Sequence, residues 1–189
     1  MKLFRTPFTM VLLITLLTAC TSGPQVRSDF DHSANFASYK TFGFVSPLGT
    51  DVDGYSTLIT QRLKSATQRE MEARGYRYTE SDPDLLVNFS ARLAKKVQVD
   101  PLASQQIGYY SYRRVGVYKT WPSYAYQNNV DEYTEGTLNI DLVDAKRKQL
   151  VWEGVAVGRV TDAKLANPEP AIDNAVAEIF TKYTYRAAP

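Results

Sequence analysis

The sequence has 189 residues, with 22 Lys and Arg side chains against 20 Asp and Glu, one Cys and one His. This length suits a single domain, and a formal net charge of +2 is too small to indicate nucleic-acid binding by itself. A single Cys excludes an intrachain disulfide and a Cys-rich zinc site. A single His disfavours most His-based metal sites and a catalytic triad. The composition therefore favours a protein without enzymatic activity, metal or cofactor.

Residues 1–19 have the pattern of a signal peptide. Lys2 and Arg5 give it a positive start, and its apolar stretch, 8–17, has ten residues, whereas a helix needs about 20 to cross a bilayer. A charged start, a short apolar core and small residues at the end are typical of secretory signals. The last residues, Leu17-Thr18-Ala19-Cys20, resemble the bacterial lipobox. This resemblance implies cleavage before Cys20, a diacylglycerol on its thiol and an acyl chain, such as palmitate, on its amine.

A lipid on Cys20 predicts that the membrane is a partner of the mature chain. Two or more acyl chains anchor a protein stably without any segment that crosses the bilayer. The residue after Cys20 is Thr21 and not Asp, so the inner-membrane retention signal is missing. We therefore expect the outer membrane of a Gram-negative cell, with the protein facing the periplasm. The predicted organisation is a lipidated tether at 20–25 and a single domain at 26–189.

The first half of the domain predicts short strands around one helix. Residues 26–30 and 39–45 have strand-like composition, with aromatic or β-branched residues in alternation. Apolar residues at helical spacing predict a helix over 55–74. Asp51 or Asp53 is a candidate for its N-terminal cap, and Gly75 is placed to end it.

The remaining pattern predicts more strands and a second helix. A brief strand at 76–79 precedes a strand at 85–94, where apolar and polar residues alternate. Residues 138–143 alternate in the same way, and a polar turn at 144–148 joins them to a strand that begins at Leu150, which predicts a β-hairpin. An apolar stripe over 172–183 predicts the second helix. Together these elements predict an α+β fold of two layers, a mostly antiparallel β-sheet with two amphipathic helices packed on it.

Several short blocks, in order along nearly the whole mature chain, resemble the domain-of-unknown-function family numbered 4136. The resemblance implies a bacterial envelope lipoprotein without an assigned activity, and it transfers no catalytic residues. The blocks are Asp29-Phe30-Asp31, Tyr39-Lys40-Thr41-Phe42, Gly75-Tyr76, Asp82-Pro83-Asp84-Leu85, Gly136-Thr137-Leu138, Asp141-Leu142-Val143-Asp144 and Leu150-Val151-Trp152-Glu153-Gly154.

The segment 101–130 is rich in Tyr, with basic residues interleaved. Tyr, Trp and Arg are enriched at recognition hot spots, and they stack on sugars and make cation–π contacts. Tyr is also a good strand former, so the same residues fit an extended strand of the sheet. The predicted lipid anchor disfavours nucleic acid as the partner. The candidate binding residues are Tyr109, Tyr110, Tyr112, Arg113, Arg114, Tyr118, Trp121, Tyr124 and Tyr126.

Other polar residues fit structural roles better than catalytic ones. His32 lies in a polar turn beside two carboxylates, where an exposed turn residue is the favoured interpretation. Asp141, Asp144 and Glu153 could form a carboxylate cluster across the hairpin, but Asp141 alternates with apolar positions, as on a solvated sheet face. We expect Trp152 to be a core residue.

Three functional hypotheses follow. The first is a non-enzymatic, periplasm-facing lipoprotein that acts as a binding or assembly module, with an envelope protein or a glycan as its partner. The second is a structural or stress-related envelope lipoprotein without a specific ligand. The third, which the composition disfavours, is a small hydrolase or transferase that uses the hairpin carboxylates.

Overall fold

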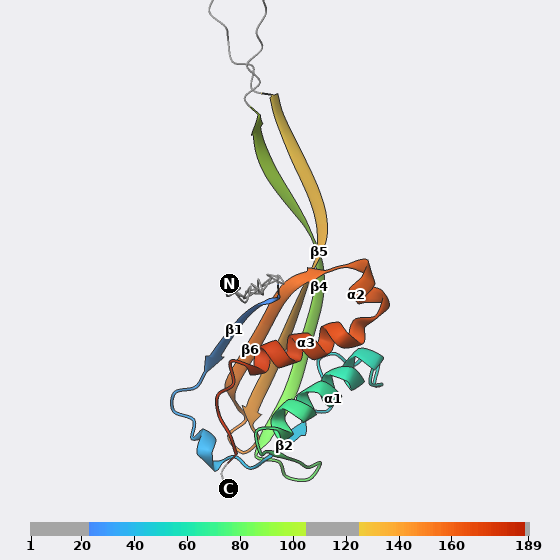
Figure 1. The fold of residues 1–189 in the computed structure, drawn as a ribbon. Coiled ribbons are helices and arrows are strands. Elements are labelled where there is room, and N and C mark those ends of the chain that lie inside the picture. The colour runs from blue at the N-terminus through green and yellow to red at the C-terminus, as the bar shows by residue number, and fades with distance from the viewer. Residues whose placement is uncertain (1–22, 105–124, 188–189) are drawn as a thin grey trace, which may run out of the picture.

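A computed structural model describes residues 23–104 and 125–187 of the chain. Six strands form one sheet in the order β1-β6-β5-β4-β2-β3, and α1 and α3 cover one of its faces (Figure 1). The prediction of an α+β fold is confirmed. The elements are β1 (Gln25–Phe30), a 3₁₀ turn (Phe36–Ser38), β2 (Thr41–Phe44), α1 (Leu58–Glu72), β3 (Arg77–Tyr78), β4 (Leu85–Ser104), β5 (Ala125–Asp144), β6 (Gln149–Val160), α2 (Asp162–Ala166) and α3 (Pro168–Phe180).

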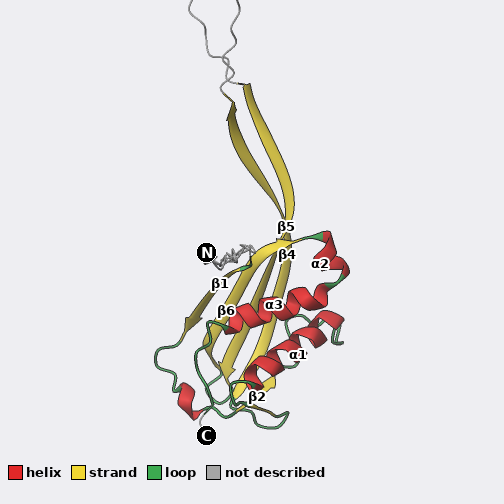
Figure 2. Cartoon of the chain, viewed as in Figure 1, coloured by secondary structure: helices red, strands yellow, loops and turns green. Residues whose placement is uncertain are grey.

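The sheet is mixed, although most of its pairing is antiparallel. Strands β1, β6, β5 and β4 pair antiparallel with one another, whereas β2 pairs parallel with both β4 and β3. The parallel pairing follows from the connection that contains α1, since this helix carries the chain back before β3 begins (Figure 2).

The core lies between the sheet and the two longer helices. Alternation along β4 and β5 directs one set of apolar side chains to this face, and helical spacing directs the apolar stripes of α1 and α3 back onto it. Trp152, predicted as a core residue, is 1% exposed. Gly154 leaves room for it, because a Cβ at Gly154 would collide with Cη2 of Trp152 and Cγ2 of Ile179. The core therefore requires glycine at this position.

Both predicted helices form, but they begin and end at other residues than the sequence predicts. Helix α1 begins at Leu58, and its cap is the Oγ1 of Thr57, which accepts the N–H of Thr60 at 3.0 Å. The prediction of an Asp cap is wrong because Asp51 instead accepts the N–H of Leu48, in the preceding loop, at 2.8 Å. Gly75, with φ of +88°, adopts the left-handed conformation just after the helix.

The second predicted helix, α3, starts and ends earlier than its apolar stripe indicated. It runs from Pro168 to Phe180, and the short helix α2 precedes it. Tyr183 lies beyond the helix end but remains in the core, where its hydroxyl is 2.8 Å from that of Tyr76. The spacing of Tyr183 predicted its burial, whereas the turn at Thr181 decides where the helix ends.

The hairpin of β4 and β5 extends far beyond the rest of the sheet. Each strand has 20 residues, paired from Leu85–Asp144 to Ser104–Ala125. Strand β6 follows β5 only as far as Thr134, and β2 follows β4 only as far as Val87. Residues 96–104 and 125–133 therefore form a two-stranded ribbon that projects from the body of the domain (Figure 1). Its nine residue pairs give it a length of about 30 Å at about 3.3 Å per residue.

Candidate interaction site

Arg159, near the end of β6, joins the body of the domain to the ribbon. Its guanidinium donates to Oδ2 of Asp131 at 3.0 Å and to Oε1 of Gln98 at 2.7 Å. The same group lies 4.1 Å from the ring centroid of Tyr133, in a cation–π contact. These partners come from both strands of the ribbon, so one side chain fixes the direction in which the ribbon leaves the sheet. The sequence pattern does not indicate a role for Arg159, since its partners are distant in the sequence.

The two faces of the ribbon base differ in character. On the face with Arg159, Lys96 also forms an ion pair with Glu135, at 3.7 Å. The opposite face continues from the core and bears Leu93 and Val97, each 58% exposed. Lys95 lies between these two on the same face, and no ion pair joins it to a described residue. The strand alternation thus places an uncovered apolar pair around a basic residue.

Only the two outer parts of the predicted Tyr-rich segment are described. The outer parts of the segment, 101–104 and 125–130, are strand residues of β4 and β5. Tyr126 is in β5 opposite Ala103. The remaining candidates lie outside the described residues, in the chain that connects Ser104 to Ala125. They are Tyr109, Tyr110, Tyr112, Arg113, Arg114, Tyr118, Trp121 and Tyr124. Cys20 also lies outside the described residues.

The three hairpin carboxylates do not form one cluster. Asp141 lies opposite Glu153 across β5 and β6, and opposite Asn88 across β4 and β5. Burial, followed by the charge of Glu153, raises the pKa of Asp141, while a hydrogen bond from Asn88 opposes the shift. Asp144 pairs with Leu85, a core position, and so lies on the other face of the sheet.

Asp144 has a structural role in the turn between β5 and β6. It is 8% exposed and accepts the backbone N–H groups of Lys146 and Arg147, the Nε–H of Arg147 and the hydroxyl of Tyr39, the last at 2.9 Å. Burial alone would raise the pKa of this carboxyl, but the hydrogen bonds from Arg147 and Tyr39 hold it below its ordinary value. The Asp144 carboxylate therefore joins the β5–β6 turn to Tyr39, just before β2.

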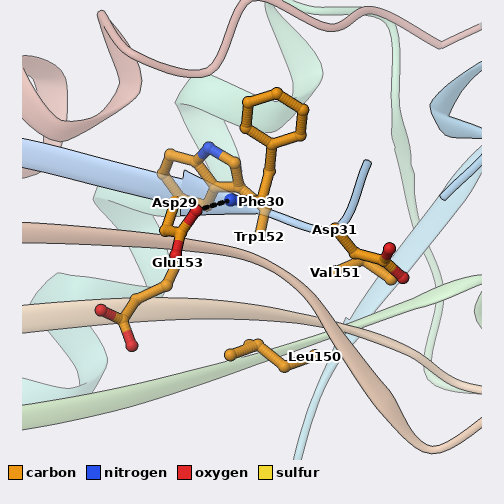
Figure 3. A pocket seen from close by; sticks show the side chains of 7 residues that line it. All are labelled: Asp29, Phe30, Asp31, Leu150, Val151, Trp152 and Glu153. Carbon is orange, nitrogen blue, oxygen red and sulfur yellow. Dashed lines mark hydrogen bonds between the residues drawn. The ribbon is translucent and has the colours of Figure 1, made fainter. Parts of the chain in front are cut away.

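A shallow hollow of about 260 Å³ lies where β1 meets β6. Figure 3 shows that its lining side chains do not converge: Trp152 and Phe30 project to one side of the strands and Glu153 to the other. Asp29 accepts the N–H of Phe30 at 2.9 Å.

His32, beside this hollow, contacts the ring of Phe30, with the centroids 4.4 Å apart. Within residues 23–104 and 125–187, no group of His, Cys, Asp and Glu is arranged to hold a metal ion.

Replacing Asp141 with Asn is expected to stabilise the domain near neutral pH. The change removes repulsion between two opposed cross-strand carboxylates, an effect of about 0.5 kcal/mol. Because folding raises the pKa of Asp141, the wild type loses stability as this group ionises, and the advantage of Asn disappears as the pH falls below 3.8. Urea unfolding of both proteins, near neutral pH and below pH 3.8, measures this difference in stability. Glu153→Gln should give a similar gain that is not additive with the first, and full additivity would contradict the coupling.

A family comparison identifies the domain. The family model "Domain of unknown function (DUF4136)" matches residues 26–184. The chain belongs to the DUF4136 family. The predicted family resemblance is thereby confirmed. None of the curated protein sequences matches this DUF4136 chain significantly.

Several solved structures are similar to this DUF4136 domain at low sequence identity. A PDZ domain protein from Parabacteroides distasonis matches with a TM-score of 0.56 and 13% identity, over 86% of this chain. The match spans only 37% of that protein, so this chain corresponds to about a third of its length. PelC from Paraburkholderia phytofirmans, solved as a dodecamer, gives a TM-score of 0.48 at 8% identity, over 86% of this chain and 98% of PelC. A minor lipoprotein from Acinetobacter baumannii gives a TM-score of 0.40 at 9% identity, over 77% and 92% of the two chains.

Among the helices of the described residues, none combines the length and the apolar character needed to cross a bilayer. Membrane attachment through Cys20 stays a prediction of the signal sequence.

Proposed function

We propose that this DUF4136 protein is a lipid-anchored component of the bacterial outer membrane that faces the periplasm and acts as a non-enzymatic binding or assembly module. The observation that carries the proposal is the projecting ribbon of β4 and β5, whose strands are joined by the Tyr-rich segment. A ribbon held by Arg159 presents its far end about 30 Å from the body. Its partner would be an envelope protein or a glycan that Tyr, Trp and Arg can contact.

The arrangement of acidic groups favours binding over catalysis. Asp144 is on the opposite face of the sheet from Asp141 and Glu153, and its oxygens are taken up by the turn. Acid–base catalysis by paired carboxylates requires two groups that face one substrate. The hollow beside Glu153 contains neither of the other two carboxylates. We therefore assign the hairpin carboxylates no catalytic step.

The anchor is tested by replacing Cys20 with Ala and separating the cell membranes. We expect the protein to leave the outer-membrane fraction, because the acyl chains supply the anchoring free energy. The matched control is Thr21→Asp, which should keep the lipid but move the protein to the inner membrane. Tight outer-membrane association of the Cys20→Ala protein would refute the lipid anchor.

The binding role is tested by crosslinking in intact envelopes followed by recovery of the protein. A variant with Tyr109, Tyr110 and Tyr112 changed to Ala should recover at least about tenfold less partner, since truncation of hot-spot aromatics costs about 2 kcal/mol or more each. Tyr55→Ala is the control, because Tyr55 is an exposed tyrosine, 61% accessible, outside the ribbon. Equal recovery from both variants would contradict binding through the Tyr-rich segment.

A further inference from the structure

Strand β1 forms one border of the sheet. Among the strands of the described residues it pairs only with β6, and Figure 1 shows it at the side of the sheet. Antiparallel neighbours exchange hydrogen bonds at alternate residues. The N–H of Asp31 donates to the carbonyl oxygen of Val151 at 2.9 Å, so the backbone groups of odd-numbered residues face β6. The backbone groups of the even-numbered residues therefore point away from the sheet, at Val26, Ser28 and Phe30.

The outer edge of β1 is open to a partner strand. Residues 27–30 are all exposed. No described backbone group bonds the outward groups of Val26 and Ser28, and the N–H of Phe30 is bonded only by the carboxylate of its own neighbour, Asp29. Edge strands are commonly protected from pairing by a Pro or a β-bulge. Strand β1 contains no Pro, and its pairing with β6 is regular over its whole length.

The order of side chains along β1 is complementary to itself. Two copies of β1 can lie antiparallel with Ser28 opposite Ser28 of the second copy. This register brings Arg27 of each copy opposite Asp29 of the other, on the face of the sheet away from the helices. It also brings Val26 opposite Phe30, as an apolar pair on the helix side. Opposite charges and apolar side chains at facing positions stabilise a pair of strands.

The side chains of β1 have the groups that this contact needs. Arg27 and Asp29 form no ion pair with any residue in the described part of the chain. Val26 is half-buried and Phe30 is 38% exposed, so both have apolar surface left to cover. A shift of the register by two residues in either direction would place Arg27 opposite Arg27 or Asp29 opposite Asp29. Like charges at facing positions destabilise the pair, so the charges select one register.

We propose that a second copy of this chain pairs with the outer edge of β1 about a two-fold axis at Ser28, so that the two sheets join into one. The two-fold axis uses the same edge of both copies, so the assembly closes as a dimer. Helices α1 and α3 cover one face of the sheet and stay clear of this edge (Figure 2). The two ribbons point in opposite directions. The contact involves neither the ribbon nor the lipid on Cys20, and the inference therefore goes beyond the proposed function.

A disulfide at the two-fold axis tests this contact. Ser28→Cys places two thiols at facing positions, where Cα atoms about 5.5 Å apart suit a disulfide. The matched control is Gln25→Cys, at an exposed residue of the same strand, whose two copies would lie about 20 Å apart along the strands. After mild oxidation of the purified full chain, Ser28→Cys should give at least about fivefold more disulfide dimer than Gln25→Cys. The wild type, whose one Cys is Cys20, gives the background.

Charge reversal tests the register separately. In the Ser28→Cys chain, the further change Asp29→Arg should lower the yield of dimer by about fivefold or more, because like charges then face each other at both ends of the contact. Adding Arg27→Asp to that chain should restore the yield, because the two charges are then exchanged and opposite signs face each other again. Both chains lack the bond from Asp29 to the N–H of Phe30, so its loss cannot explain the recovery.

The other outcomes overturn the inference. Equal yields of dimer at positions 28 and 25 would show that the copies meet at random, and a larger yield at 25 would show a different register. A chain with both charge reversals that dimerises as poorly as the chain with Asp29→Arg would show that these charges do not face each other. None of these results would affect the proposed function, which depends on the Tyr-rich segment and the anchor.

Discussion

Replacing Trp152 with Ala is expected to lower the free energy of unfolding by about 3–5 kcal/mol. The indole is 1% exposed and contacts the rings of Phe180 and Tyr183, with centroid distances of 5.9 and 5.1 Å. It thus joins β6 to both α3 and the segment that follows α3. The backbone around Gly154 is fixed by the sheet, so the cavity left by Ala cannot close fully. Urea unfolding followed by far-ultraviolet circular dichroism measures the loss without relying on the deleted fluorophore.

Leu150→Ala is the matched control for this prediction. Leu150 is also in β6, two residues from Trp152, but it is 45% exposed. Its truncation should cost less than about 1 kcal/mol, because water already covers much of the side chain. Similar losses from the two substitutions would contradict the placement of Trp152 at the centre of the core.

The sequence predicts the body of this fold well because the pattern and the packing agree there. Apolar residues recur at every second position over 85–89 of β4 and 138–142 of β5, and these apolar residues of both segments pack against the helices. The helical stripe of α1 includes Leu63 and Ala66, which are buried as expected, whereas Leu58 and Ile59, at the start of the same stripe, are exposed. Local spacing and the environment of the folded chain therefore select the same residues in the strands and in the middle of α1, but not in its first turn.

The sequence allowed an extended strand in the Tyr-rich segment, but it did not predict the length or the register of the ribbon, because the ribbon strands are held by pairing and not by burial. After Leu93 the sequence of β4 continues with Ala94, Lys95 and Lys96, where the alternation is lost. Its partner in β5 is equally polar around Asp131. Hydrogen bonds between two exposed strands leave no period-two signal, since neither face must be apolar. Arg159 was overlooked for the same reason, because its contacts exist only once the hairpin register is known.

The carboxylates show a second limit of sequence spacing. Asp141 and Asp144 lie three residues apart, which in a regular strand places two side chains on opposite faces. The sequence spacing therefore predicts that Asp141 and Asp144 lie on different faces of the sheet, as the structure shows. That Asp141 lies opposite Glu153 could be predicted only if the register of β5 and β6 were known. The irregularity between Leu142 and Val143 shifts that register by one residue, and no local motif marks it.

Replacing Arg74 with Ala is expected to lower the free energy of unfolding by about 2–4 kcal/mol. Its guanidinium donates to the carbonyl oxygens of Phe180, at 2.7 Å, and Tyr183, at 3.3 Å, so it ties the end of α1 to the end of α3. It also pairs with Glu70, at 2.7 Å, and lies 5.1 Å from the ring centroid of Phe180. The side chain is 17% exposed, so water cannot readily replace these hydrogen bonds.

Two substitutions separate this specific role of Arg74 from a general effect of charge. Arg69→Ala, five residues earlier, removes an ion pair with Asp173 whose partners are 59% and 41% exposed, and it should cost less than about 1 kcal/mol. Arg74→Lys keeps the charge but not the planar group with several donors, so it should recover only part of the loss. Full recovery by Lys, or equal losses at Arg69 and Arg74, would show that charge alone is needed. We instead expect the largest loss for Arg74→Ala, a smaller loss for Arg74→Lys and the smallest for Arg69→Ala. This order would show that the helix layer is stabilised by the hydrogen bonds from Arg74 to the carbonyl groups of Phe180 and Tyr183, which only an arginine can make together.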